Sequence, residues 1–313
     1  MADFQLNRKE LFDKLKKLDT EQRNPDSMHI DVASPLEIVE IINEQDKHVA
    51  GVIESKKEHI ARAIELVAEA IRKGGRLIYA GSGTSGRIGV VDAAECPPTF
   101  GTEPEQIKGL IAGGAEAMFI AQEGAEDSED TGATAITGIN LNEKDVLCAL
   151  AASGRTPFVT GALAEANKRN AKTIFICCVP ASQIAKELKC DILIDLPVGA
   201  EVIMGSTRMK SATAQKMVCN MITTGSMIRL GKVYENVMVD LQLTNLKLVE
   251  RAKRIVMMFT GLEYEEAEQL LEKAGNHVKT ALIMAKTGLN TQESKKLLEE
   301  HGGFVSSVIE HVN

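Results

Sequence analysis

Five short, strongly apolar runs in the middle of the chain constrain its fold more than any other feature. Each run is separated from the next by a stretch long enough for a helix. Such runs are typical of parallel strands buried on both faces, and their alternation with helices predicts an α/β doubly wound sheet. In such a sheet, ligands bind beyond the carboxyl ends of the strands. The runs are Arg76–Ala80, Ile107–Ala112, Asp145–Ala151, Thr173–Val179 and Asp191–Leu196.

Helical patterns precede these runs. Apolar residues at spacings of three, four and seven predict a long helix from Val49 to Ile71, which Gly74-Gly75 ends. Two shorter helices are predicted before it, one with Leu11, Leu15 and Leu18 on one face and one over Leu36–Asn43.

Helical patterns also follow the runs. Thr207–Leu230 and Val237–Phe259 show no strand signal, and the charged tail from Gly261 on holds three or four short helical segments. The prediction is a three-layer doubly wound parallel sheet with N-terminal helices and a small C-terminal three-helix domain. The expected boundaries are residues 1–75 for the N-terminal helical segment, 76–259 for the sheet domain with its long helices, and 260–313 for the tail.

Charge and composition exclude several classes of function for this chain. The net charge of −8 argues against a general nucleic-acid or anionic-membrane binder, and no apolar run is long enough to span a bilayer. The amino terminus lacks the pattern of an export signal. The six cysteines form no CxxC pair, so we expect reduced thiols in the cytoplasm and no metal site. A cytoplasmic enzyme or a small-molecule sensor remains.

The first candidate loop, Ala80–Arg87, directly follows a predicted strand. Ser82, Thr84 and Ser85 supply hydroxyl donors, and the following helix presents free N–H groups. The dinucleotide pattern G-x-G-x-x-G is formally present, but no acidic residue ends the second predicted strand, and no P-loop Gly-Lys-Ser/Thr follows. The three hydroxyls favour a site for a phosphate monoester over a dinucleotide site, a P-loop or a plain tight turn.

The second candidate loop, Ala151–Pro157, follows another predicted strand and repeats this chemistry. It holds Ser153, Gly154, Arg155 and Thr156 before a proline suited to the first turn of a helix. Two such loops in one predicted sheet support a phosphate site far better than one.

Two groups of carboxylates are candidates for acid/base chemistry. Glu95 precedes Pro97-Pro98, which we expect to stop the helix and leave Glu95 at a helix–loop junction. Glu123, Glu126 and Asp127 surround a glycine. An isolated acidic cluster is usually a solvated turn, but the neighbouring phosphate loops favour a catalytic role here.

These residues resemble a known family. The run Gly81–Gly101 (GSGTSGRIGVVDAAECPPTFG) is similar to the hallmark segment of N-acetylmuramic acid 6-phosphate etherases, sugar-phosphate-isomerase (SIS) domain proteins of bacterial cell-wall recycling. The likeness covers nearly the whole chain. Further matching segments are Thr20–Pro25, Leu110–Gly114, Glu123–Ser128, Ala151–Pro157, Gly205–Lys210, Thr213–Lys216, Gly231–Tyr234 and His301–Phe304.

The resemblance implies an activity and a set of site residues. The family cleaves the D-lactyl ether of N-acetylmuramic acid 6-phosphate to N-acetylglucosamine 6-phosphate and D-lactate, without metal or organic cofactor, as a cytosolic homodimer. Its acid/base positions fall on Glu95 and Glu126, with Asp127 as a further candidate. Residues 76–259 then correspond to the SIS domain, and the tail is similar to ubiquitin-associated (UBA) three-helix modules.

The chemistry suits two carboxyl groups in different protonation states. In the open-chain sugar, a base can remove the C2 proton α to the aldehyde while an acid protonates the departing lactate oxygen, and water then adds at C3. We assign Glu95 as the acid and Glu126 as its partner. An aldose–ketose isomerase would use the same C2 proton abstraction without releasing lactate. A sugar-phosphate sensor would bind the ligand without turning it over.

Overall fold

The computed structural model describes residue 16 and the ranges 18–184 and 188–312. Leu11 and Leu15, the core of the first expected helix, lie outside the described residues. The chain forms two compact units, one of residues up to Ala93 with Lys108–Ile222, the other of Ala94–Ile107 with Thr223 onward. Short 3-10 helices span Asp19–Glu21 (η1), Pro25–Ser27 (η2), Ile30–Val32 (η3), Ala115–Met118 (η4) and Ala181–Gln183 (η5).

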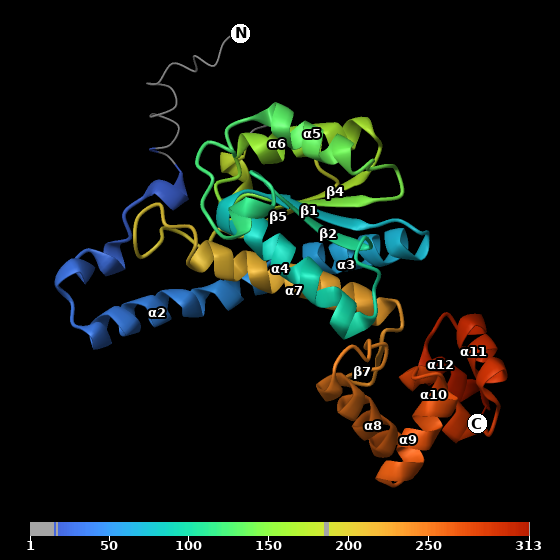
Figure 1. Cartoon of the computed structure of the whole chain (residues 1–313). Coiled ribbons are helices and arrows are strands. Elements are labelled where there is room, and N and C mark those ends of the chain that lie inside the picture. Colours follow the sequence, from blue (N-terminus) through green and yellow to red (C-terminus); the bar gives the residue numbers. More distant parts are fainter. Residues whose placement is uncertain (1–15, 17, 185–187, 313) are drawn as a thin grey trace. The chain divides into compact units, whose positions relative to one another are not determined.

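A five-stranded parallel sheet forms the first unit's centre, in the order β2-β1-β3-β4-β5 (Figure 1). All five predicted strands are confirmed, with ends shifted by at most two residues, and so is the doubly wound α/β class. The order reverses between β1 and β3, which are neighbours although β2 separates them in sequence. The strands are β1 (Leu77–Gly81), β2 (Ile107–Ile111), β3 (Val146–Leu150), β4 (Lys172–Cys177) and β5 (Ile192–Asp195).

One face of the sheet packs on α5 (Glu129–Gly138) and α6 (Pro157–Lys168) (Figure 1). Side chains alternate across a strand, so every second strand residue reaches this face. Its core holds Ile78 and Ala80 of β1, Leu147 and Ala149 of β3, and Phe175 and Cys177 of β4.

The opposite face packs on α3 (Lys57–Arg72) and on the unit's parts of α4 (Gly83–Phe100) and α7 (Lys210–Arg229). Fully buried Tyr79 of β1 donates its hydroxyl to Asp92 Oδ2 at 2.8 Å. Asn220 of α7 donates to the other oxygen of Asp92 at 2.5 Å. Burial raises the pKa of Tyr79, so its hydroxyl remains a donor. These bonds fix both helices against the sheet.

The boundary between the two N-terminal helices lies later in the chain than predicted. Helix α2 runs over Pro35–Glu54 and begins with a capping box of Ser34 and Glu37, and α3 follows after Ser55-Lys56. The polar stretch after Asn43 continues α2, because a helix tolerates polar residues on its solvent face.

The expected helix stop at Pro97-Pro98 is wrong. Helix α4 includes both prolines and ends at Phe100, where Gly101 N–H donates to the carbonyl of Pro97 at 2.9 Å. Proline's fixed φ is compatible with a helix, and the lost N–H bonds lie within the final turns. Glu95 therefore lies inside a helix and not at a helix–loop junction.

The helix predicted over Val237–Phe259 begins later than expected. A small hairpin of β6 (Val233–Tyr234) and β7 (Val237–Met238) precedes α8 (Leu246–Thr260). Strands of two residues are too short to produce a periodic signal.

The C-terminal helices form one core with α8. Gly261 ends α8 in a left-handed conformation, and four helices follow where three were expected. Helix α8, which we expected within residues 76–259, contributes Leu248, Ala252, Ile255 and Val256 to this core. The likeness of the tail to UBA modules stays a prediction. The four helices are α9 (Tyr264–Lys273), α10 (Val278–Thr287), α11 (Thr291–Glu300) and α12 (Val305–Val312).

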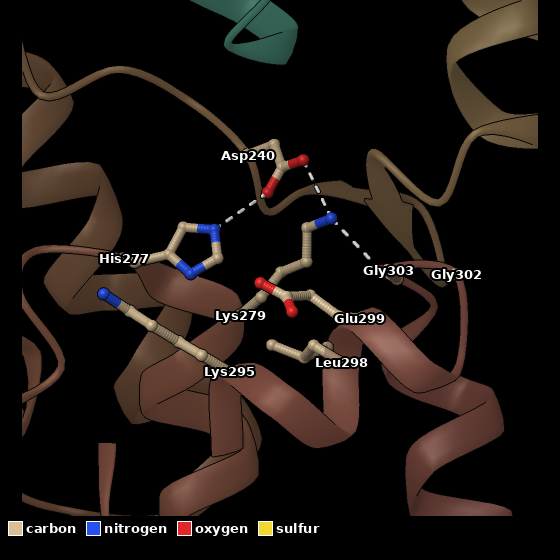
Figure 2. Close-up of a pocket in the computed structure, with 8 residues that line it drawn as sticks. All are labelled: Asp240, His277, Lys279, Lys295, Leu298, Glu299, Gly302 and Gly303. Atoms are coloured by element: carbon tan, nitrogen blue, oxygen red, sulfur yellow. Dashed lines mark hydrogen bonds and ion pairs between the residues drawn. The ribbon is translucent and has the colours of Figure 1, made fainter. Parts of the chain in front are cut away.

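An ion cluster around Asp240 organises this second unit. Figure 2 shows the Asp240 carboxylate between the His277 ring and the Lys279 ammonium. The carboxylate lies 2.8 Å from Lys279 Nζ, 3.0 Å from Lys232 Nζ and 3.2 Å from His277 Nε2. Burial raises the pKa of Asp240, but the His277 hydrogen bond and the two lysine charges outweigh burial and hold that pKa well below its usual range.

The cluster borders a cavity of about 570 Å³, also lined by Lys295 and Glu299. Lys279 Nζ also donates a hydrogen bond to the carbonyl of Gly303 at 3.1 Å. The buried charges thus satisfy one another, and we interpret the cluster as structural.

We predict that Asp240→Asn lowers the free energy of unfolding by about 3–5 kcal/mol, because it leaves the buried Lys279 without a charge partner. Chemical denaturation followed by circular dichroism measures this loss. Since the pKa of Asp240 is depressed, the stabilisation exists above about pH 4 and is lost as pH falls further, so the difference should shrink in acid.

Glu299→Gln is the matched control, because Glu299 lines the same cavity with an exposed side chain. It should change stability by less than about 0.5 kcal/mol. Equal losses in both variants would contradict a structural ion cluster.

Candidate functional site

The loop after β1 presents a helix N-terminus at the carboxyl edge of the sheet. β1 ends at Gly81, α4 begins at Gly83, and Gly86 N–H donates to the carbonyl of Ser82 at 3.1 Å as the first helical bond. A Cβ on Gly86 would lie 2.7 Å from the carbonyl oxygen of Gly81, so only glycine allows this tight turn. The first N–H groups of α4 then point out of the helix, where they attract anions.

The loop after β3 emerges beside it. Gly81 pairs with Leu150 in the parallel register of β1 and β3, so both loops start from adjacent strands. Gly154 turns the second loop with a φ of +71°, and its N–H donates to the carbonyl of Ala151 at 3.0 Å. Thr156 is the N-cap of α6, and its side chain makes no capping bond. The two hydroxyl-bearing loops therefore both leave the sheet where the strand order reverses, the usual ligand position in such sheets.

A cavity of about 390 Å³ lies against the first loop. Ser82, Gly83 and Arg87 line one side, and the acidic loop from Ala121 to Glu126 lines another. The Ser82 hydroxyl donates to Glu126 Oε2 at 2.8 Å, and Arg87 Nε donates to the carbonyl of Met118 at 3.1 Å. Phe158 N–H at the start of α6 donates to the backbone carbonyl of Glu126 at 3.0 Å, which ties the acidic loop to the second loop's helix.

The other predicted phosphate ligands lie outside the lining of this cavity. Thr84, Ser153 and Thr156 are half-buried, and Ser85 is buried. The exposed Arg155 donates to the carbonyl of Gln183 at 2.7 Å.

The remaining predicted carboxylates do not line the cavity either. Asp127 follows Glu126 with an exposed side chain. Glu95 is exposed on α4 and belongs to the second compact unit. The structure thus brings Glu126, and none of the other acid/base candidates, into contact with a predicted phosphate ligand.

Gln215 on α7 is a site neighbour that our sequence analysis did not assign. The Ser85 hydroxyl donates to Gln215 Oε1 at 2.8 Å, and both residues are buried. The one signal for it in the sequence is the segment Thr213–Lys216, which resembles the family without indicating a role for Gln215.

A buried polar network fixes the start of α7. The fully buried Glu201 accepts from the N–H groups of Lys210 and Ser211 at 3.0 and 2.9 Å. Lys210 Nζ donates to Gln45 Oε1 at 2.7 Å, and Asn24 Nδ2 donates to the same oxygen at 2.8 Å. Burial lowers the pKa of Lys210. The segments Thr20–Pro25 and Gly205–Lys210 thereby hold α7, and with it Gln215.

In the part of the chain that the structure describes, no three His, Cys, Asp or Glu side chains gather as metal ligands. None of the described helices is both long and apolar enough to cross a membrane. The cysteines of the described residues form no disulfide, and burial raises the pKa of Cys177 to about 12.

Three domain families match the sequence. They are the N-terminal SIS domain of glucokinase regulatory protein over residues 59–167, the SIS domain over 116–225, and the C-terminal lid domain of glucokinase regulatory protein over 235–279. A solved phosphoheptose isomerase from Francisella tularensis is 17% identical with a TM-score of 0.45, and the match covers 61% of this chain and 100% of that one.

Curated relatives match much more closely. The chain is 52% identical to the N-acetylmuramic acid 6-phosphate etherase of Salinibacter ruber, over 87% of this chain and 88% of the relative. Proteins of the same name from Lactobacillus acidophilus and Clostridioides difficile are 54% and 50% identical, over 86% of this chain and 89% and 88% of theirs.

We predict that Gly154→Ala weakens binding of inorganic phosphate about tenfold, or ~1.4 kcal/mol. The new methyl group would lie 3.1 Å from Val179 Cγ2 at a φ of +71°, which forces the second loop to move. Isothermal titration calorimetry measures the change.

Gly288→Ala is the control, because Gly288 has a φ of +73° with nothing within 4 Å of the added Cβ. It should cost similar stability without loss of affinity. Unchanged binding in Gly154→Ala would exclude the second loop from the phosphate site.

Proposed function

The chain belongs to the N-acetylmuramic acid 6-phosphate etherase family, and from this premise we propose how its residues cleave the D-lactyl ether. It is an enzyme of amino-sugar recycling, a carbon–oxygen lyase that forms N-acetylglucosamine 6-phosphate and D-lactate. The observation that carries the proposed mechanism is the 2.8 Å hydrogen bond from Ser82 to Glu126, because it joins the first hydroxyl loop to a carboxylate beside a cavity.

The 6-phosphate binds at the two hydroxyl loops. Donors from one side are the N–H groups at the N-terminus of α4 and the hydroxyls of Ser82, Thr84 and Ser85. Ser153, Gly154, Arg155 and Thr156 provide donors from the other, since their loop leaves the adjacent strand. A phosphate held from two strands fixes the distant C2 and C3 atoms against the acid and base.

Glu126 acts as an acid/base residue next to this phosphate site. Its carboxylate accepts the hydrogen bond of the Ser82 hydroxyl at 2.8 Å. A phosphate oxygen competes for the same proton, so substrate binding releases the Glu126 carboxylate for proton transfer. Glu95 protonates the departing lactate oxygen; its family-like segment supports this role, and its exposed side chain leaves the carboxyl group accessible. Asp127 is the alternative to Glu126.

The reaction is an elimination followed by an addition. Removal of the C2 proton and protonation of the C3 ether oxygen release lactate and leave an unsaturated aldehyde, to which water adds at C3. An acid/base pair contributes about 10²–10⁴-fold to such proton transfers. No step of this route requires a metal or an organic cofactor.

We also propose that the enzyme is a homodimer in the cytoplasm. Its ligand is a sugar phosphate, and it does not bind nucleic acid. Cysteines that form no disulfide among the described residues are consistent with the cytoplasm. Three exposed apolar side chains lie close in sequence on η3 and the start of α2: Val32, Leu36 and Val39, which are 79%, 67% and 61% exposed. We call them the apolar patch, because exposed apolar surface of this kind marks protein interfaces.

The test of the activity is incubation of the pure protein with N-acetylmuramic acid 6-phosphate in ¹⁸O-water, followed by mass spectrometry. We expect lactate release with ¹⁸O in the sugar, because water adds at C3. Label in lactate would contradict elimination, a ketose product would indicate an isomerase, and tight binding without turnover would indicate a sensor.

Carboxylate variants test the roles. Glu126→Gln should lower kcat by about 10²–10⁴-fold, and Glu95→Ala should stop lactate release. Glu123→Gln is the matched control, because Glu123 lines the same cavity on the same loop, and it should retain activity. Full activity in Glu126→Gln together with a loss in Asp127→Asn would transfer the role to Asp127.

Introducing charged residues into the apolar patch tests whether it forms the dimer interface. The double variant Leu36→Glu/Val39→Glu should sediment as a monomer in analytical ultracentrifugation, because two carboxylates cannot be buried in an apolar interface. Met258→Glu, a change at a similarly exposed apolar residue of α8, should leave the dimer intact. A patch variant that stays dimeric would place the interface elsewhere.

A further inference from the structure

Gln215 has an unusual hydrogen-bond arrangement next to the first hydroxyl loop. Its residue is 1% exposed, and Oε1 accepts the Ser85 hydroxyl at 2.8 Å. Its Nε2 is buried and has no hydrogen-bond partner among the described residues. A buried donor without a partner costs about 1–3 kcal/mol, so such a group calls for a physical explanation.

The same arrangement makes Ser85 unsuited to bind phosphate. Ser85 is in the first turn of α4, where the N–H groups attract an anion. A hydroxyl has one proton to donate, and Ser85 gives it to Gln215. Its oxygen then offers only lone pairs, which a phosphate oxygen repels.

Exchange of the two ends of the amide resolves both problems. Rotation by half a turn places Nε2 against Ser85 Oγ as a donor, and the Ser85 proton becomes free for an acceptor in front of α4. The carbonyl end then takes the unpartnered position, where an unpaired acceptor is tolerated better than an unpaired donor.

We propose that Gln215 is a positioning residue for phosphate: with substrate bound, its Nε2 donates to Ser85 and directs the Ser85 proton to a phosphate oxygen. This inference rests on the proposed function of the two hydroxyl loops. Gln215 itself does not touch the substrate. The buried network at Glu201 and Lys210 holds the first turn of α7 and so fixes the distance from Gln215 to Ser85.

The test compares Gln215→Glu with Gln215→Met. A carboxylate has nearly the shape of the amide but only accepts, so it keeps the Ser85 proton and adds a negative charge near the phosphate. We expect Gln215→Glu to raise KM for N-acetylmuramic acid 6-phosphate about 10–100-fold, and Gln215→Met to raise it only about threefold, with kcat changed less than threefold in both. As pH falls, the introduced carboxyl group gains a proton that it can donate, so KM of Gln215→Glu should return toward the wild-type value.

A double-mutant cycle separates positioning from general damage. In the Ser85→Ala background, Gln215→Glu should raise KM by much less than in the wild-type background, because its effect acts through the missing hydroxyl. Cys219→Ala, a buried change one turn along α7, is the packing control and should leave KM unchanged. Equal effects of Gln215→Glu in both backgrounds, or an unchanged KM, would overturn the proposal.

Binding of inorganic phosphate and N-acetylglucosamine 6-phosphate, measured by calorimetry, makes the inference independent of turnover. If the wild-type protein releases no lactate, the etherase mechanism fails. The Gln215 proposal still stands or falls on whether Gln215→Glu weakens phosphate binding through Ser85.

Discussion

Parallel pairing of β1 with β3 is the constraint on which the site depends. Neighbouring strands lie about 4.8 Å apart, and the register sets Gly81 opposite Leu150, so two loops leave the sheet side by side. The chain runs from β1 through α4 to one side and from β3 through α6 to the other. This divergence leaves the starts of both hydroxyl loops at the carboxyl edge, where we propose that the phosphate binds. An anion bound there would meet backbone N–H groups and hydroxyls from two directions.

Buried polar contacts hold the elements around this opening. Tyr79, Asp92 and Asn220 connect β1, α4 and α7, and Ser85 and Gln215 connect the same two helices nearer the site. Unsatisfied polar groups are costly in a protein interior, so each such contact permits one arrangement of the helices. The rigidity that a phosphate site requires therefore comes from polar side chains in the core as well as from apolar packing.

Much of the fold follows from local signals. Runs such as Thr173–Val179 are apolar on both faces, which only a strand covered by two helix layers satisfies, and all five strands were predicted within two residues. Where local signals conflict, packing decides. The helix stop expected at Pro97-Pro98 is wrong, because both prolines fall near the end of α4, where few backbone hydrogen bonds are lost. The β6–β7 hairpin was not predicted, because strands of two residues produce no periodic pattern.

The sequence by itself determined the strand–helix alternation, the two hydroxyl loops and the family likeness, because these depend on composition and spacing within short segments. Only the tertiary structure decided which separated residues meet. It placed Ser82 against Glu126 and Ser85 against Gln215, across 44 and 130 positions of the chain. It also buried the polar residues Lys210 and Gln215 at the start of α7, which no amphipathic pattern indicates. Contacts of this kind arise from strand order and helix packing, and no periodicity in a single segment records them.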